Sequence, residues 1–307
     1  MLTRSKVALN NVLGFNSKLA NLLKGWTFLE TSLGAVARIK NFASTTPNEN
    51  QIGESFVPHK AWPSHGTVTL NHVYAEYNDG CAPALRDINL SISGGQKIGI
   101  CGRTGSGKSS LLLTLLRLLE TSSGSIEIDG VDIATVPRDV LRSRFVAIPQ
   151  DPFMLAGGVR SNADPTDSAT DADITAALER VGLWSAIASR GGLDTDLSAQ
   201  PLSQGQQQLF CLARAMLRRT AAVGGGVLVL DEATSNVDSA TDALMQKVIR
   251  EEFRGWTIIV VAHRLETILD ADKIIVLDQG RIVEEGPPEV LLKRDGEFKR
   301  LYGSVEA

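Results

Sequence analysis

The chain has 307 residues and a mass of 32.9 kDa, a size that suits one large domain with an extension or two small domains. Its formal net charge is −4 at pH 7, so bulk charge gives no indication of binding to nucleic acid or to an anionic membrane. The three cysteines and four histidines lack the spacings of a metal site, which disfavours a zinc centre and indicates a reducing compartment.

The N-terminal part of the chain is predicted to be helical and then to become a linker. Residues 1–43 contain no proline, and charged residues interrupt their apolar runs. The longest uncharged run, Val7–Ser17, is shorter than the roughly 20 apolar residues that a membrane-spanning helix needs, and the order of features that marks a secretory signal is absent. We therefore expect an amphipathic helix that packs on another element. Residues 44–66 contain three prolines among small and polar residues, which is typical of a linker.

A glycine-rich loop lies between a predicted strand and a predicted helix. Lys97–Cys101 has the short apolar character of a buried strand, and Leu111–Leu119 is a leucine-rich run without Gly or Pro, as expected of a helix. Glycine allows backbone conformations in which successive N–H groups converge on one anion. The start of the following helix adds unsatisfied N–H donors and a partial positive charge. The loop is therefore expected to bind phosphate groups.

The side chains of the loop complete this prediction. Lys108 can reach the β- and γ-phosphates of a nucleotide, and the hydroxyl of Ser109 can ligate Mg²⁺. The alternative, a glycine-rich turn that only happens to precede a lysine, is disfavoured because the whole pattern occurs between a strand and a helix. The expected binding residues are Gly102, Thr104, Gly105, Ser106, Gly107, Lys108, Ser109 and Ser110.

Predicted strands and helices alternate along the rest of the chain. Strands, including two hairpins, are expected at residues 67–70, 87–93, 125–133, 145–150, 227–230, 257–261 and 273–285. Helices are expected at residues 138–144, 171–189 and 206–218. This alternation predicts the α/β class with a mostly parallel sheet.

Two acidic residues follow the apolar strand 227–230. Burying a carboxylate without a partner is costly, and a nucleotide with bound Mg²⁺ would provide a partner here. Asp231 suits a role in holding the metal through water or Ser109, and Glu232 could polarise the attacking water.

The segment Leu202–Gln206 resembles the signature sequence of ATP-binding-cassette (ABC) ATPases, and it lies between Gln150 and the Asp231-Glu232 pair as in that family. The resemblance covers residues 67–300. The motifs occur in the family's order: Tyr77, Gly102–Ser109, Gln150, Leu202–Gln206, Leu230–Ser235, Asp238 and His263.

The resemblance implies the fold and the domain order. We expect an α/β P-loop NTPase domain of the ABC type over residues 67–303, with a mostly parallel core sheet, an antiparallel β subdomain and a helical signature subdomain. It also implies that residues 1–43 are the helical end of a transmembrane domain and that residues 44–66 are the linker between the two.

The resemblance also implies roles for individual residues. Tyr77 is expected to stack on adenine, with Tyr74 as the alternative. Gln150 is expected to contact Mg²⁺ and the attacking water, and His263 to contact the γ-phosphate. The implied catalytic residues are Glu232, His263, Lys108 and Gln150, and the implied ligands of Mg²⁺ are Ser109, Gln150 and Asp231.

In this family two such domains bind ATP head to tail. Ser203, Gly205 and Gln206 are therefore expected to contact an ATP that a second domain holds, and a lone copy should hydrolyse ATP poorly. The sequence departs from the family pattern at Gln204, which replaces a glycine, and at Gln207-Gln208, where a basic residue is frequent.

The surrounding sequence resembles one subfamily. Ile148–Pro152 and residues 158–165 are similar to the C-terminal nucleotide-binding domain of multidrug-resistance-associated (C-type) transporters, as are Leu29–Thr31 and Ala37–Lys40. Residues 220–229 and 242–252 look most like fungal members. The resemblance implies the C-terminal piece of a longer membrane exporter, with this domain on the cytoplasmic side.

The expected function is ATP hydrolysis that powers the export of a small organic or amphipathic substrate. The expected partners are transmembrane domains and a second nucleotide-binding domain in the same polypeptide, with no nucleic acid. The first alternative is a soluble ABC ATPase that acts on ribosomes or DNA, which the N-terminal segment disfavours. The second is a regulatory module that barely hydrolyses ATP, which Glu232 and His263 disfavour.

Overall fold

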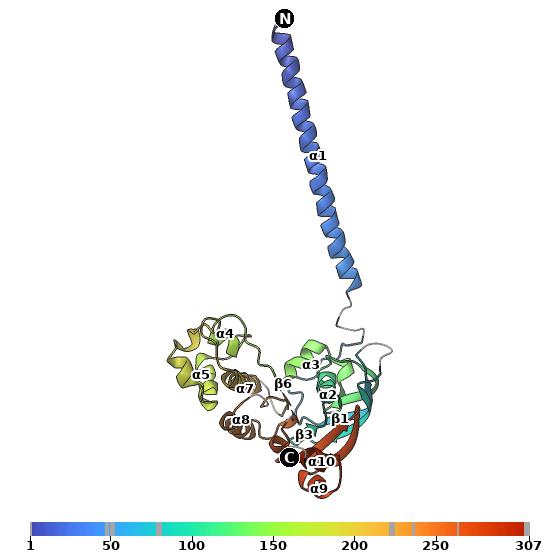
Figure 1. Cartoon of the computed structure of the whole chain (residues 1–307), viewed down its shortest axis with the longest axis vertical. Helices are drawn as coiled ribbons and strands as arrows, with labels where there is room; N and C mark the ends of the chain where they lie inside the picture. Colours follow the sequence, from blue (N-terminus) through green and yellow to red (C-terminus); the bar gives the residue numbers. More distant parts are fainter. Residues whose placement is uncertain are drawn as a thin grey trace. The chain divides into compact units, whose positions relative to one another are not determined.

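An uninterrupted helix forms the first part of the protein. The computed structural model describes residues 2–46, 49, 53–77, 82–220, 225–234, 237–262 and 264–303, and the chain divides into two compact units, Met1–Gln51 and Ile52–Ala307. Helix α1 (Leu2–Thr45) makes up most of the first unit (Figure 1). Among the described residues, no helix combines the length and the apolar content that crossing a bilayer requires.

Helix α1 is less amphipathic than its sequence predicts. Many of its exposed apolar side chains recur at alternating spacings of three and four residues, which places them along one side: Val12, Phe15, Leu19, Leu22, Trp26, Leu29, Leu33 and Val36. Ile39, three residues after Val36, extends this side, whereas Phe28 and Phe42 are exposed outside the stripe. The spacing also places Lys18 and Glu30 on the side of the stripe. Apolar and charged residues are therefore only partly separated on this helix.

A six-stranded sheet forms the core of the second unit. Its strand order is β10-β9-β3-β8-β7-β6, and each neighbouring pair is parallel except β9 and β10. The strands are β3 (Lys97–Cys101), β6 (Phe145–Ile148), β7 (Val227–Asp231), β8 (Thr257–Val261), β9 (Lys273–Asp278) and β10 (Arg281–Gly286). The predicted mostly parallel sheet and its closing hairpin are confirmed.

A smaller antiparallel sheet lies beside the core sheet, with the strand order β2-β1-β4-β5. Its strands are β1 (Val68–Ala75), β2 (Leu85–Ile92), β4 (Thr121–Ile128) and β5 (Val131–Asp132). Strand β1 continues five residues beyond the predicted end at residue 70. Its pairing with β2 is irregular between Leu70 and Val73, where His72 has a positive φ of 49°.

The helices of the second unit connect its strands or follow the last of them. They are α2 (Lys108–Leu115), α3 (Arg138–Arg144), α4 (Val159–Ala163), α5 (Asp171–Arg180), α6 (Trp184–Ala188), α7 (Gln204–Thr220), α8 (Ser239–Glu252), α9 (Pro288–Lys293) and α10 (Glu297–Gly303). Short 3₁₀ helices lie at Ile133–Thr135, Gly192–Asp194 and Leu265–Ile268. The single helix predicted over residues 171–189 is wrong, because Gly182 adopts a φ of 72° between α5 and α6.

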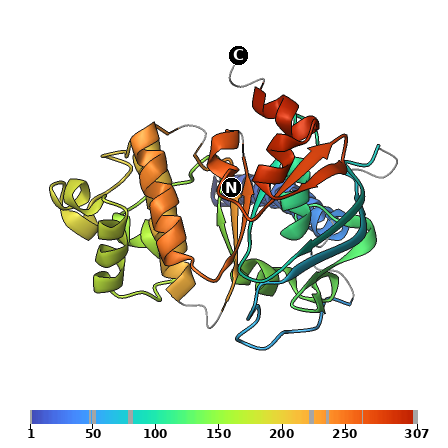
Figure 2. The same cartoon turned by 90° about the horizontal axis from the view of Figure 1, so that it is seen from below.

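The core sheet is buried on both faces because its inner strands are apolar apart from residues at their ends. Along β8, Ile258 and Val260 belong to one hydrophobic cluster, whereas Ile259 and Val261 belong to another. Helices α5, α7 and α8 complete the first cluster, and α2 with the antiparallel sheet completes the second. The two groups lie on opposite sides of the core sheet (Figures 1 and 2). The parallel register brings the C-terminal ends of β3, β7 and β8 to one edge.

The residues before β1 pack on the domain, although their composition predicts a linker. The second unit starts at Ile52. The indole N–H of the buried Trp62 donates to the carbonyl of Ile128 at 2.9 Å. The carboxylate of Asp129 accepts from four successive backbone N–H groups, those of residues 64–67, at 2.7–3.3 Å. Where the functional domain begins stays a prediction, but residues 53–66 belong to its packed surface.

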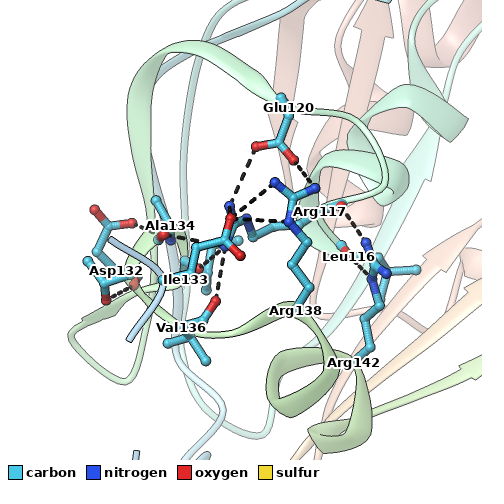
Figure 3. A network of polar contacts seen from close by, with 11 residues as sticks. Leu116, Arg117, Glu120, Asp132, Ile133, Ala134, Val136, Arg138 and Arg142 are labelled. Atoms are coloured by element: carbon cyan, nitrogen blue, oxygen red, sulfur yellow. Dashed lines mark hydrogen bonds and ion pairs between the residues drawn. The ribbon is translucent and has the colours of Figure 1, made fainter. Parts of the chain in front are cut away.

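A buried charge cluster anchors the start of this segment. Glu54 contacts Arg117 at 2.7 Å and Arg138 at 3.1 Å, and all three side chains are at most 7% exposed. Arg117 and Arg138 are also directed toward Glu120 (Figure 3). The shortest distances from their guanidinium nitrogens to the carboxylate oxygens of Glu120 are 3.6 Å for Arg117 and 2.7 Å for Arg138. Arg117 also donates to the carbonyls of residues 133, 134 and 136. The cluster joins the incoming chain to the residues that follow helix α2.

Candidate functional site

The glycine-rich loop follows β3 and ends at helix α2, at the edge where the parallel strands end. Gly102, Gly105 and Gly107 have φ values of 147°, 79° and 104°, a region that strongly favours glycine. A Cβ atom at Gly102 would also collide with the carbonyl oxygen of Leu277. Gly107 is the N-cap of α2 and has no side chain to bond the first N–H groups of the helix. These donors remain available for an anion.

The ammonium group of Lys108 lies inside the curve of this loop. Its Nζ donates to the carbonyl of Gly102 at 2.9 Å and to that of Arg103 at 3.3 Å. The lysine therefore adds a full positive charge to the N–H donors of the loop. An ammonium ion among backbone donors suits the charge of a di- or triphosphate.

A cavity of about 660 Å³ opens in front of the loop, within the range of small-molecule sites. It is lined by Tyr77, Ala84, Gly102, Arg103, Thr104, Gly105, Gly107, Lys108, Ser109, Ser110, Glu232, Ala262, Leu265 and Leu301. Most of the residues predicted to bind the nucleotide therefore share one cavity. Ser106 is buried and is not part of the lining.

Tyr77 is the aromatic residue of this lining. Its hydroxyl lies 3.0 Å from that of Ser110, and 58% of the residue is exposed, so a ring face is accessible for stacking. Tyr74, the alternative, lies in β1 opposite Ser123 and does not line the cavity. The geometry favours Tyr77 as the contact for a base.

Two acidic residues lie at the C-terminal end of strand β7: Asp231 is its last residue and Glu232 follows it. Burial raises the pKa of Asp231, as does the negative charge of Glu232, while Lys108 acts against both. Within the part of the chain that the structure describes, Oδ1 of Asp231 is buried without a hydrogen-bond partner. A buried, unpaired carboxylate oxygen and the hydroxyl of Ser109 are hard oxygen donors of the kind that Mg²⁺ takes together with phosphate oxygens. The residues present therefore fit this metal.

Glu232 faces the cavity from an unusual backbone conformation. Its φ is 46°, in the left-handed region, and its N–H donates to the carbonyl of Val261 at 3.0 Å. The parallel pairing of β7 and β8 thus fixes the residue that carries this carboxylate. It is the one acidic side chain among the lining residues that the structure describes.

The predicted signature residues lie at the start of α7 and do not line the cavity. The N–H of Ser203 donates to Oε1 of Gln206 at 3.0 Å, and the N–H of Gln206 donates to Oγ of Ser203 at 3.3 Å, which forms a reciprocal cap on the helix. A Cβ atom at Gly205 would lie 3.8 Å from Thr241, close to the Asp238 cap of α8. The cavity and the signature are separate surfaces of the domain.

The remaining predicted residues either do not line the cavity or lie outside the described residues. Gln150 follows β6 as an exposed residue and does not line the cavity. His263 and Ser235 lie outside the described residues. Sequence reasoning missed Ala84, Ala262, Leu265 and Leu301 as lining residues. Ala262 could have been found, because it follows the apolar strand β8, whereas Leu301 reaches the cavity only through the packing of α10.

Comparison with known proteins identifies relatives of this domain. Residues 85–235 match the family model described as ABC transporter. The chain is 52% identical over 302 residues to ABC multidrug transporter B of Aspergillus fumigatus, covering 98% of this chain and 20% of that protein. It is 44% identical over 299 residues to the ABC transporter atnG of Emericella nidulans, covering 97% and 19%. The chain thus spans about a fifth of these relatives.

The fold resembles that of a solved exporter. The structure of a bacterial Atm1-family ABC exporter with ATP bound matches 91% of this chain and 48% of that chain, with a TM-score of 0.81 and 29% sequence identity.

Proposed function

We propose that this chain, which belongs to the ABC transporter family through its nucleotide-binding domain, is the ATP-hydrolysing motor of a longer membrane exporter. One observation carries the proposal. The glycine-rich loop, Lys108 and Glu232 line the same cavity of about 660 Å³. The ammonium group of Lys108 and the backbone N–H groups of the loop, which suit phosphate, thus line the same cavity as the carboxylate of Glu232, which suits proton transfer.

The residues of the cavity have distinct proposed roles in binding ATP. The N–H groups of the loop and the Nζ of Lys108 bind the β- and γ-phosphates, and the ring of Tyr77 stacks on adenine. Ser109 and Asp231 hold Mg²⁺, which, when bound, neutralises charge on the phosphates. Occupied in this way, Asp231 would have the partner that it lacks within the described residues.

Hydrolysis requires a group that orients water and accepts its proton. We assign this role to Glu232, which lines the cavity next to Asp231. The water oxygen forms a bond to the γ-phosphorus, the bond from that phosphorus to the bridging oxygen breaks, and the water proton passes to the carboxylate of Glu232. Gln150 is proposed to contact the attacking water, and His263 is proposed to contact the γ-phosphate.

The proposed exporter needs parts that lie beyond this domain. Ser203, Gly205 and Gln206 form a surface separate from the cavity, which supports their role toward an ATP held by a second nucleotide-binding domain. The names of the relatives, a multidrug transporter among them, support export of a small organic or amphipathic substrate through transmembrane domains, with this domain on the cytoplasmic side.

Phosphate release from ATP and Mg²⁺ by the 307-residue chain tests the proposal. Glu232→Gln should still bind ATP but release phosphate at least about 100-fold more slowly, the low end of general-base contributions. Glu251→Gln changes an exposed glutamate of α8 and serves as the matched control. If two domains act head to tail, the rate per chain should also rise with protein concentration. Equal rates for the wild type and Glu232→Gln would overturn the assignment.

A further inference from the structure

A buried glutamine joins the signature helix to the loop that carries Gln150. Gln208 lies in the second turn of α7 and is 1% exposed. Its Nε2 donates to the carbonyl of Gln150 at 2.5 Å and to that of Pro149 at 3.4 Å. Helix α7 starts next to Ser203. The same helix therefore begins at the signature residues and bonds directly to the main chain of Gln150.

Burying the side-chain amide of Gln208 lowers the stability of the fold, which indicates that its Nε2 donor has a role. Oε1 of Gln208 is buried without a hydrogen-bond partner in the described part of the chain, and the next residues of the helix, Leu209 and Phe210, are buried apolar side chains. An unsatisfied buried polar atom typically destabilises a fold by about 1–3 kcal/mol. An apolar residue of similar length would avoid this cost but could not bond the carbonyls of Pro149 and Gln150.

A second residue of α7 holds the same loop further along. Arg214 donates to the carbonyl of Phe153 at 3.2 Å and to that of Asn162 at 2.8 Å. The side chain of the fully buried Asn162 in turn bonds both the N–H and the carbonyl of Leu155, at 2.7 and 3.0 Å. Because α7 contacts the loop at two points, the loop and the helix are expected to move together.

We propose that Gln208 is a positioning residue for ATP hydrolysis, which fixes the main chain of Gln150 to the helix that starts at the signature. The inference rests on the function proposed above. Gln208 does not line the cavity. It acts by holding the carbonyl of Gln150, whose carbon is bonded to the Cα atom that carries the Gln150 side chain. A shift of α7 caused by a partner at Ser203 would thereby be transmitted to Gln150.

The first test replaces the donor without shortening the side chain. Gln208→Met in the 307-residue chain should leave the dissociation constant for ATP within about twofold and lower the turnover at saturating ATP by about 10- to 100-fold, the scale on which small misplacements of catalytic groups act. Gln208→Leu, which also removes the donor and stays apolar, should lower turnover by a similar factor and replaces Gln208→Met if the methionine variant fails to fold. The control is Gln96→Met, which also removes a side-chain bond to the main chain, from the N–H of Ser93 at 2.9 Å.

A double-mutant cycle separates positioning from general stability. If Gln208 acts through Gln150, then Gln208→Met should lower turnover little further in a chain that already carries Gln150→Ala. Wild-type turnover in Gln208→Met, or an undiminished loss in the Gln150→Ala background, would overturn the inference. Failure of the proposed function gives a different result, in which the wild type and Glu232→Gln release phosphate at the same rate.

Discussion

The hydroxyl of Tyr77 lies 3.0 Å from the hydroxyl of Ser110, the third residue of helix α2. This contact joins Tyr77 to the helix that follows the glycine-rich loop. Both residues line the cavity of about 660 Å³. The aromatic ring is thereby held on the same cavity wall as the loop expected to bind the phosphates.

Replacing Tyr77 should weaken ATP binding. Stacking of a base on an aromatic side chain is worth about 1–3 kcal/mol, so Tyr77→Ala should raise the dissociation constant roughly 5- to 150-fold. Tyr77→Phe keeps the ring and loses only the contact with Ser110, so its affinity should stay close to that of the wild type. Equilibrium titration with ATP measures both. Tyr74→Ala is the control, and a larger loss there than in Tyr77→Ala would move the adenine contact to Tyr74.

Asp231 should make the fold less stable at neutral pH than an uncharged residue would. Burial and the charge of Glu232 raise its pKa above the usual 3.8, so between pH 3.8 and the folded pKa the folded state holds a proton that the unfolded state has lost. Stability from this group is therefore present below pH 3.8 and is lost as the pH rises through the folded pKa. Without Mg²⁺, Asp231→Asn should raise the melting temperature at pH 7, with the difference disappearing below pH 3.8.

The control for this prediction is Asp295→Asn, which changes an exposed aspartate before α10. Mg²⁺ and ATP together should stabilise the wild type more than Asp231→Asn, because the variant loses a proposed metal ligand. A lower melting temperature for Asp231→Asn at pH 7 without Mg²⁺ would contradict the assigned cause.

Glu54 should be important for stability although it lies in the segment predicted as a linker. Its side chain is 3% exposed and pairs with Arg117 and Arg138. Glu54→Gln would leave two buried guanidinium groups with less compensating charge and should lower the free energy of unfolding by about 3–5 kcal/mol. Urea unfolding measures this change. Glu285→Gln breaks an exposed pair with Lys273 and should cost about 1 kcal/mol or less; equal effects would show that the cluster does not anchor the segment.

Two glycines should respond in opposite ways to replacement by alanine. At Gly102 the positive φ and the nearby carbonyl of Leu277 leave no room for a Cβ atom, so Gly102→Ala should distort the loop and weaken ATP binding at least about tenfold. Gly34 lies within α1 with open space around it. Gly34→Ala should therefore stabilise helix α1 by about 0.5–1 kcal/mol, which raises its helical content, and should leave the affinity for ATP unchanged. Circular dichroism and ATP titration distinguish the two results.

The core of this fold could be predicted because its signals are local. The apolar runs Val227–Leu230 in β7 and Ile258–Val261 in β8 indicate parallel strands that are buried on both faces, and the structure confirms them. The glycine-rich loop is recognisable because strand, loop and helix follow one another directly. The shared cavity of Tyr77 and Glu232 follows from the family resemblance rather than from any periodicity.

Other features depend on contacts between residues far apart in the sequence. The prolines of residues 44–66 predict a linker, but Glu54 and Trp62 contact partners more than 60 residues away. The break between α5 and α6 depends on the conformation of one glycine, Gly182, inside an apolar repeat. The bond from Gln208 to Gln150 spans 58 residues, and no pattern in the sequence points to it.

Binding of phosphate groups by the glycine-rich loop is tested by the affinity of the 307-residue chain for ATP and for AMP, measured by equilibrium titration in the wild type and in Lys108→Ala. The loop is proposed to bind the β- and γ-phosphates, so the wild type should bind ATP at least about tenfold more tightly than AMP, a difference of about 1.4 kcal/mol. Lys108→Ala should remove most of that preference, whereas Lys247→Ala, on the exposed side of α8, should keep it. Equal affinities for ATP and AMP in the wild type, or an unchanged preference in Lys108→Ala, would show that the loop does not bind the β- and γ-phosphates.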